Sequence, residues 1–398
     1  MKHTGIISIL YAAFAACSLL VCGCSSSAED DPAQGTDICQ VAFRLGGAAG
    51  SSSSSRAEAE TTDGKELQTN LEKQVNTLLA FIFKDEDPGG DTEDNDNDKF
   101  FRMVEIDLGG KTDPVIDDLT FSVGDEGDYL VTFVANIDKE RDPDLAEAIA
   151  GFQKGVTTIG QFKNLEVLQS PDTKPGMLMT SGFIRFHSSL IEPVNLGTVY
   201  LRRIMSRIDI INMAPGVIVT RAVLHNRTIK SLLYNDATLQ VKEDYIEVPN
   251  AKEYTIEPAL VGNMDTPAKY EAKIYSYEQL ADQTQGIYQP SVDIYYTKDD
   301  SGEQEFKHTV ELKVPESEAD DAPMVPIGLK RNNAYLIYLR VDAGDIRFRI
   351  KVEDWVEGEA FTVTDQDLTE GALGIPTAPG TVTGGTWGSE EAETVTAE

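Results

Sequence analysis

The clearest group of chemically capable side chains is a run of acidic and amide residues near position 100. Asp94, Asp96 and Asp98 alternate with asparagines, and Glu105 stands at position 12 of the same run. Oxygen ligands at positions 1, 3, 5 and 12 resemble the spacing of an EF-hand calcium loop. Lys99 occupies position 6, where that loop needs glycine, and no helices are predicted on either side. We therefore expect a solvated hairpin loop, with calcium binding as the alternative.

A second short motif, Gly110-Lys111-Thr112, resembles the end of a phosphate-binding P-loop. The leading glycine of that motif is absent, because Glu105 stands in its place. Asp113-Pro114 follows where a phosphate-binding helix would begin. We expect an ordinary turn at this point.

The histidines and nucleophiles do not form a recognisable catalytic set. No two of His3, His187, His225 and His308 are close enough in sequence for a helical metal pair. The sequence also lacks a G-x-S-x-G nucleophile elbow and a G-x-G-x-x-G loop. We therefore predict a protein that is not an enzyme and needs neither cofactor nor metal. A catalytic pair of carboxylates assembled by the fold is the remaining alternative.

The charge of the chain excludes one class of partner. The 398 residues include 67 acidic and 34 basic side chains, for a net charge of −33. So acidic a protein repels the phosphate backbone that nucleic-acid-binding proteins must attract. We expect no nucleic-acid partner.

The first residues predict export and lipidation. An apolar run over 6–21 follows Lys2 and fits the h-region of a signal peptide. It ends in Gly23-Cys24, a small residue before a cysteine, which looks like a bacterial lipobox with cleavage after Gly23 and acylation of Cys24. Cys17 is a second, less favourable site, and an uncleaved anchor is a further alternative. All four cysteines lie within the first 39 residues, so no disulfide framework is predicted for the body of the chain.

A short strand is predicted directly after a polar tether that spans 25–37. Val41, Phe43 and Leu45 alternate with more polar residues, which is typical of a strand with one buried face. A glycine- and serine-rich linker follows over 46–55 and ends in Arg56. A single basic residue at the end of such a linker is accessible to a trypsin-like protease.

The rest of the chain predicts a mainly β fold with few helices. Asp142 and Pro143 begin one helix, in which Leu145, Ile149 and Phe152 recur at helical spacing. Short strands bounded by turn residues favour β-sandwich domains. We expect two transthyretin-like sandwiches in tandem, with one or two short helices in the first. The predicted strands are 78–83, 103–108, 129–135, 183–186, 199–201, 208–211, 217–224, 254–256, 270–277, 292–296, 335–341 and 346–352.

The domain boundaries follow from these elements. A signal peptide over 1–23 precedes a lipidated segment over 24–56, which carries the first strand. Two sandwich domains are expected over 57–205 and 206–365, with the boundary near Ser206. An acidic tail over 366–398 completes the chain, and its apolar residues are too sparse for a domain.

Tyrosines are frequent in the second predicted domain. They form either a carbohydrate-binding platform or ordinary cross-strand pairs, and the second is the more common role of tyrosines on strands. The residues concerned are Tyr270, Tyr275, Tyr277, Tyr288, Tyr295 and Tyr296.

The order of these elements resembles that of the fimbrillins, or type V pilins, of anaerobic gut and oral bacteria. The resemblance depends on the sequence of lipobox, first strand, linker ending in Arg56, and helix beginning at Asp142. Its most specific part is Arg331-Asn332 followed by Tyr335, with a later strand that ends in Trp355. Other stretches that follow the family order are NTLLAFIF, GDYLVTFVAN, VYLRRIMSRIDI, LKRNNAYLIYLRV and FRIKVEDW.

The resemblance implies a precursor that reaches the outer membrane through the acyl chain on Cys24. A trypsin-like protease then cuts after Arg56 and removes the lipid together with the first strand. The processed protein is expected on the cell surface, as a structural subunit of a fimbria that supports adhesion.

The resemblance further implies that Val41, Phe43 and Leu45 occupy an apolar groove only temporarily. A strand of the next subunit would refill the groove by donor-strand complementation and join subunits head to tail into a homopolymer. The candidate donor residues lie near the C-terminus: Phe361, Val363 and Leu368, with Leu373 and Ile375.

Several alternatives stay open at this point. The first strand could be a permanent edge strand, and the tail a disordered extension. The subunit could belong to the stalk, the tip or the anchor of a fimbria. The alternative function is a lipid-retained adhesin, a tip or accessory protein that binds glycans or proteins on host or bacterial surfaces. Cys39 has no assigned role.

Overall fold

The structure is a computed structural model of the chain. It describes residues 39–48, 72, 74–86, 95–112, 115–168, 176–234, 245–247, 249, 251–265, 267–269, 274–279, 289–299, 304–315, 323–342, 345–354 and 393–394. The signal peptide, the lipobox, the linker with Arg56 and the candidate donor residues lie outside the described residues.

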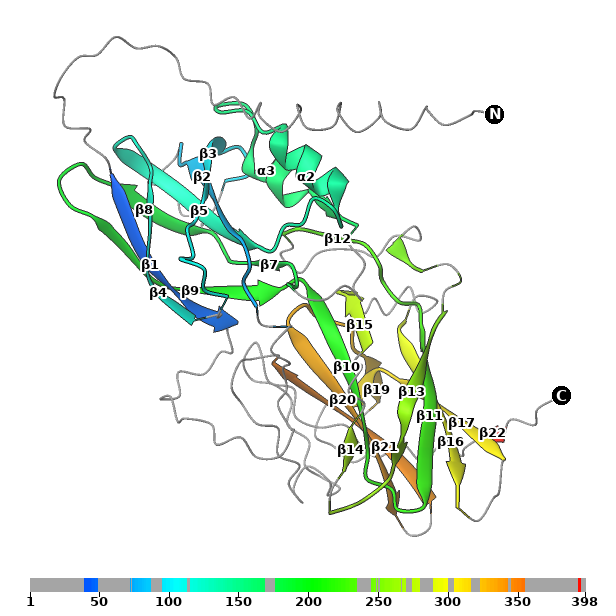
Figure 1. The fold of residues 1–398 in the computed structure, drawn as a ribbon. Helices are drawn as coiled ribbons and strands as arrows, with labels where there is room; N and C mark the ends of the chain where they lie inside the picture. The colour runs from blue at the N-terminus through cyan, green and yellow to red at the C-terminus, as the bar shows by residue number, and fades with distance from the viewer. Residues whose placement is uncertain are drawn as a thin grey trace, which may run out of the picture. The chain divides into compact units, whose positions relative to one another are not determined.

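The first half of the chain forms one eight-stranded sheet, in the order β3-β2-β5-β7-β9-β1-β4, with β8 paired to β5. Figure 1 shows β1 in blue, beside β4 and β9. The strands are β1 (Gln40–Ala48), β2 (Leu78–Lys84), β3 (Lys99–Glu105), β4 (Val115–Ser122), β5 (Gly127–Ala135), β7 (Met179–Thr180), β8 (Ile184–Ser188) and β9 (Val194–Arg203).

The strands β2 and β5 are apolar on both faces because both faces are covered. On β2, Ala80 and Ile82 belong to a core shared with β1, β4 and β9, while Phe81 and Phe83 face a second core. The second core includes side chains from the helices α2 (Pro143–Ala150) and α3 (Ile159–Lys163). A strand covered on both sides has a continuous apolar run instead of an alternation.

The second half of the chain is a sandwich of two five-stranded sheets. Side chains from both sheets, such as Ile208 and Ile337 from one and Val219 and Ile294 from the other, form one hydrophobic core. The first sheet contains β14 (Ala268–Lys269), β10 (Met205–Asn212), β20 (Asn333–Asp342), β21 (Asp345–Asp354) and β15 (Ile274–Tyr277). The second contains β13 (Ala251–Val261), β11 (Val217–His225), β16 (Ser291–Lys298), β17 (Glu305–Glu311) and β22 (Glu393–Thr394).

Two small strand pairs complete the described fold. The strand β6 (Glu166–Val167) pairs with β12 (Ser231–Leu232), and β18 (Lys313–Pro315) pairs with β19 (Met324–Pro326). Sheet membership changes between Arg203, the last residue of β9, and Met205, the first of β10. The division into domains at Ser206 stays a prediction.

The mainly β fold with sandwich packing and two short helices is confirmed. Asp142 is the N-cap of α2, and its side chain accepts a hydrogen bond from the backbone nitrogen of Leu145. The sequence-based interpretation missed α3, whose capping box consists of Thr158 and Gln161. It also missed β4 and β17, and it placed the third strand four residues late, since β3 begins at Lys99.

The acidic run near position 100 is part of the hairpin that joins β2 and β3, which pair antiparallel. Asp98 is fully buried, so the expected solvated loop is wrong at this residue. Its two carboxylate oxygens accept hydrogen bonds from the backbone nitrogens of Glu86 and Asn95, and Asp96 forms an ion pair with Lys163 at 2.9 Å. These carboxylates are engaged within the protein, and their contacts give the calcium alternative no support.

The P-loop-like motif forms a turn, as expected. Gly109 and Gly110 both have positive φ, and the backbone nitrogen of Lys111 donates to the carbonyl oxygen of Leu108. In the part of the chain that the structure describes, no three His, Cys, Asp or Glu side chains are grouped to hold a metal ion. None of the described helices is long and apolar enough to cross a membrane.

The tyrosines do not form the carbohydrate platform. Tyr275, Tyr277 and Tyr296 are each at most 1% exposed and lie in the hydrophobic cores. Tyr295 is half-buried under the guanidinium group of Arg221, at 3.4 Å from its ring centroid. Tyr270 and Tyr288 lie outside the described residues. The platform interpretation is therefore wrong for the four described tyrosines.

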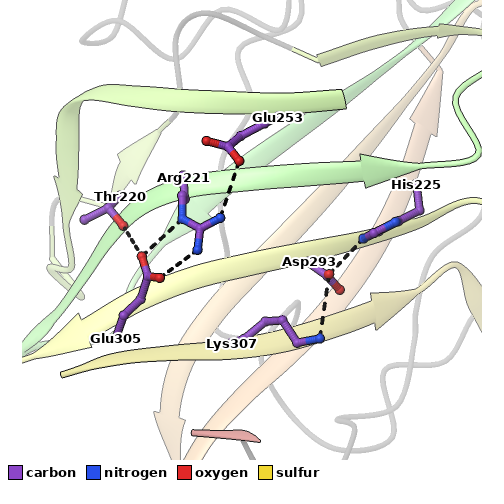
Figure 2. A network of polar contacts seen from close by, with 7 residues as sticks. All are labelled: Thr220, Arg221, His225, Glu253, Asp293, Glu305 and Lys307. Atoms are coloured by element: carbon purple, nitrogen blue, oxygen red, sulfur yellow. Dashed lines mark hydrogen bonds and ion pairs between the residues drawn. The ribbon is translucent and has the colours of Figure 1, made fainter. Parts of the chain in front are cut away.

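The outward face of the sheet around β11 carries a network of charged side chains (Figure 2). Arg221 donates to both carboxylate oxygens of Glu305, at 3.2 and 2.7 Å, and forms a longer contact to Glu253. His225 and Lys307 both contact Asp293, at 2.8 and 3.8 Å. Pairs this close to solvent contribute about 0.2–1 kcal/mol each, so the network stabilises the sheet only modestly.

One buried histidine, His308, predicts that the stability of the fold depends on pH. His308 of β17 stacks on Phe348 at 3.9 Å, and burial lowers its pKa to about 4, against a smaller opposing effect of Asp293. Between pH 6.5 and pH 4, His308 is protonated in the unfolded chain and neutral in the folded protein. Its contribution to the free energy of unfolding is therefore complete above pH 6.5 and falls as the pH drops toward 4.

We expect the free energy of unfolding to fall by about 2 kcal/mol over this window, after allowing for nearby solvent. Urea unfolding of the wild type and the His308→Phe variant at pH 7 and pH 4.5 measures it. An identical pH dependence in the two proteins would contradict the assignment.

Candidate functional site

The first strand, β1, lies inside its sheet with partners on both sides. It pairs antiparallel with β4, with Val41 opposite Phe121 and Phe43 opposite Leu119. On its other side it pairs parallel with β9, where Leu45 stands opposite Val199. The first strand is therefore not an edge strand, and its removal stays a prediction. We call the space between β4 and β9 that β1 fills the β1 slot.

The three alternating apolar side chains of β1 all point into the core. Val41 and Leu45 are fully buried, and Phe43 is 3% exposed. The ring of Phe43 lies between the rings of Phe121 and Phe133, at centroid distances of 6.0 and 4.6 Å. The alternation read from the sequence thus gives the inward face of the strand correctly.

The opposite face of β1 is exposed and contains one ion pair. Arg44 lies 2.7 Å from Asp117 of β4, and both side chains are about half exposed or more. Asp117 and Asp118 together stand opposite this one residue, because β4 contains a bulge here. Asp118 has a φ of 61°, which an aspartate tolerates better than most residues.

The strand continues past the point where the sequence predicted a linker. Gly46 pairs with Val115 of β4, and the strand ends only at Ala48. A Cβ atom on Gly46 would lie 2.6 Å from the ring of Tyr200 and closer still to the methyl group of Thr198, both on β9. Gly46 is therefore a position of close approach rather than the first residue of a flexible linker.

Cys39 immediately precedes β1 and is buried. Its side chain is 1% exposed and belongs to the same core as Phe43. Its carbonyl oxygen accepts a hydrogen bond from the backbone nitrogen of Val123. Cys39 is a free thiol with a packing role, which the sequence did not reveal.

The β1 strand contributes a large share of the stability of its sheet. Burying a valine, a phenylalanine and a leucine contributes roughly 1.5–3 kcal/mol each, or about 5–9 kcal/mol together. The net stability of a folded domain is only about 5–15 kcal/mol. Among the described strands, β4 pairs with β1 alone, so the loss of β1 would also leave β4 without a ladder partner.

A buried charged cluster lies next to the end of β9, and sequence reasoning did not find it. Glu72, Arg207 and Asp209 are all fully buried. Arg207 donates to Glu72 at 2.9 Å and to Asp209 at 2.8 Å, and the hydroxyl of Tyr275 donates to the other oxygen of Glu72. Burial alone would lower the pKa of Arg207, but Asp209 and Glu72 outweigh it and raise the pKa.

The same cluster explains part of the Arg331-Asn332 motif. The carbonyl oxygen of Glu72 accepts from the Nε of Arg203, and the side-chain oxygen of Asn332 accepts from the backbone and side chain of Arg203. Asn332 has a φ of 61°, which places it in a tight turn. Tyr335 donates to the carbonyl oxygen of Gly328 at 2.6 Å. The motif is therefore a structural turn.

Comparisons with known proteins show that this chain shares its fold with a solved structure. No protein-family model and no curated protein matches the sequence. Among solved structures, a candidate cell adhesion protein from Parabacteroides distasonis is similar over 80% of this chain and 97% of its own, with 15% identity and a TM-score of 0.50. The tip fimbrial protein Mfa3 from Porphyromonas gingivalis matches over 79% of this chain and 100% of its own, with 13% identity and a TM-score of 0.49. A fimbrilin from Porphyromonas gingivalis W83 matches over 80% and 97%, with 10% identity and a TM-score of 0.43.

Identities of this size establish an architecture and leave the activity open. The chain has the fold of the candidate cell adhesion protein from Parabacteroides distasonis.

Proposed function

We propose that the protein is a structural subunit of a bacterial cell-surface fimbria and that β1 is its replaceable strand. The observation that carries the proposal is the position of β1 between β4 and β9, with Val41, Phe43 and Leu45 in the core. The chain reaches this strand through a polar tether and leaves it through a linker that ends in Arg56. One cut in that linker would separate the strand from the rest of its domain.

Removal of β1 would expose backbone groups and apolar side chains that another strand could cover. The backbone groups of β4 and β9 that now bond to β1 would lose their partners. The side chains around Phe43 would border an open apolar groove. A strand from another subunit would restore both kinds of contact, and a head-to-tail contact of this type continues into a filament.

The lipid has a transient role in this proposal. An acyl chain on Cys24 would bring the precursor to the outer membrane, where a trypsin-like protease would cut after Arg56. The lipid would then leave together with β1. The protein that remains would be a cell-surface subunit with fimbrial partners, and any adhesion ligand would be a host or bacterial surface molecule.

The fate of residues 24–56 tests the proposal. Sheared surface material is expected to contain a protein that begins at Ala57 and has no acyl chain, as read by mass spectrometry. An acylated Cys24 in all mature material would instead favour the lipid-retained adhesin.

The Arg56→Ala variant tests the cut site directly. We expect the precursor to accumulate and high-molecular-weight polymer to fall at least tenfold on immunoblots, because the linker would lack its basic residue. Arg44→Ala is the matched control, since Arg44 is held in β1 and its loss should leave processing intact. Unchanged polymer ladders in Arg56→Ala would contradict processing at this residue.

A further inference from the structure

The β1 slot imposes a side-chain pattern on any strand that occupies it. Three inward positions, filled by Val41, Phe43 and Leu45, are each at most 3% exposed. A charged or strongly polar residue at any of them would be buried without a partner, which is among the most destabilising changes known in proteins. An occupant in this register therefore needs apolar residues at three alternate positions.

The position after the third apolar residue is restricted from the outside of the sheet. The ring of Tyr200 and the methyl group of Thr198 lie over the backbone of Gly46, where a Cβ atom would be only 2.6 Å from the ring. Tyr200 is 49% exposed in this position, so its ring covers the glycine from the solvent side. Aromatic side chains commonly cover strand glycines in this way.

We propose that Tyr200 and Thr198 select the occupant of the β1 slot, a strand donated by another subunit, by favouring glycine directly after its third inward side chain. This inference rests on the proposed function for the exchange of strands. The contacts of Tyr200 and Thr198 with Gly46 are present in the intact chain, so the selection can be tested there without strand exchange.

The sequence after β21 does not carry the required pattern. No window in 355–398 places apolar residues at three alternate positions. Phe361 and Val363 alternate, with Glu359 or Asp365 at the third inward position, and Leu373 and Ile375 alternate, with Gly371 or Thr377 there. The first strand of a second copy has the pattern, yet it lies in the segment that processing removes. A strand with the pattern apolar-x-apolar-x-apolar-Gly fits the slot in this register, whichever subunit donates it, and the homopolymer stays a prediction.

The first test uses the intact chain and the buried thiol of Cys39. A maleimide reagent modifies this buried thiol when the start of β1 opens, and peptide mapping separates Cys39 from the other cysteines. Gly46→Ala is expected to raise the modification rate about tenfold, because the Tyr200 ring and the Thr198 methyl group must move aside for the new Cβ atom. In a Tyr200→Ala/Thr198→Ser background, the same substitution should change the rate less than threefold.

Gly182→Ala is the matched control, because a Cβ atom there meets nothing within 4 Å. It should leave the rate unchanged in both backgrounds. An equal effect of Gly46→Ala with and without Tyr200 and Thr198 would overturn the selection.

The second test identifies the occupant. The full chain, nicked in the linker and verified by mass spectrometry, is incubated with excess labelled peptides, and native mass spectrometry counts the bound label. A peptide of residues 39–48 is expected to exchange into the slot, the same peptide with Gly46→Val about tenfold less, and a peptide of residues 357–367 not at all. Entry of the 357–367 peptide as readily as the first would overturn this inference and leave the proposed function standing. If the 39–48 peptide also fails to enter, strand exchange itself is refuted.

Discussion

Replacement of Phe43 by alanine is expected to lower the free energy of unfolding of the precursor by about 3–5 kcal/mol. Phe43 is 3% exposed and contacts the rings of Phe121 and Phe133, so its removal leaves a cavity that neighbouring strands cannot close. Urea unfolding followed by circular dichroism measures the change. A loss below about 1 kcal/mol would show that β1 is not seated in the core as described.

The matched control for Phe43→Ala is Arg44→Ala on the opposite face of the same strand. Its ion pair with Asp117 is exposed, so the expected loss is under about 1 kcal/mol. The proposed function adds a sharper expectation for Phe43→Ala. Fibres that have lost residues 24–56 should have wild-type stability in this variant, because the altered side chain is no longer present.

Replacement of Glu72 by alanine is the second large expected effect, with a loss of about 3–5 kcal/mol. Glu72 is fully buried and accepts from Arg207 at 2.9 Å and from Tyr275. Burial and the adjacent Glu72 carboxylate raise the pKa of Tyr275, so its hydroxyl stays protonated as a donor. Without Glu72, the buried guanidinium group of Arg207 keeps Asp209 but loses its second carboxylate. Thermal and urea unfolding of the purified chain measure the loss.

A surface carboxylate provides the comparison for Glu72. Glu305→Ala removes a partner of Arg221 with similar hydrogen-bond distances, yet Arg221 is 28% exposed and solvent can replace the carboxylate. We expect a change under about 1 kcal/mol. Equal effects at Glu72 and Glu305 would contradict the role assigned to burial. Because Glu72 follows the Arg56 linker, its cluster would also hold the new N-terminal segment in place after processing.

Local sequence patterns predicted the elements whose signals are local. The alternation of Val41, Phe43 and Leu45 gave a strand with the correct inward face, and Asp142 with Pro143 gave the start of a helix. The apolar run over 78–83 was correctly predicted as a strand, which is β2. In each case the residues concerned lie within a few positions of each other, so propensity and capping decide the outcome.

Elements with interrupted patterns were missed for a physical reason. The buried residues of β4 are Ile116, Leu119 and Phe121, and the bulge at Asp118 breaks their alternation. Gly46 looked like the start of a flexible linker, because a glycine gives no signal of the ring that covers it. Both features depend on the neighbouring strand rather than on the chain before and after them.

The sequence by itself determined a mainly β chain with a short apolar strand ahead of a linker that ends in Arg56. Only the tertiary structure decided that this strand lies between β4 and β9, running parallel to one and antiparallel to the other. It also decided that Glu72 meets Arg207, 135 positions away in the sequence. Contacts between residues so far apart are set by which strands become neighbours in the folded sheets, and no pattern within one segment records that choice.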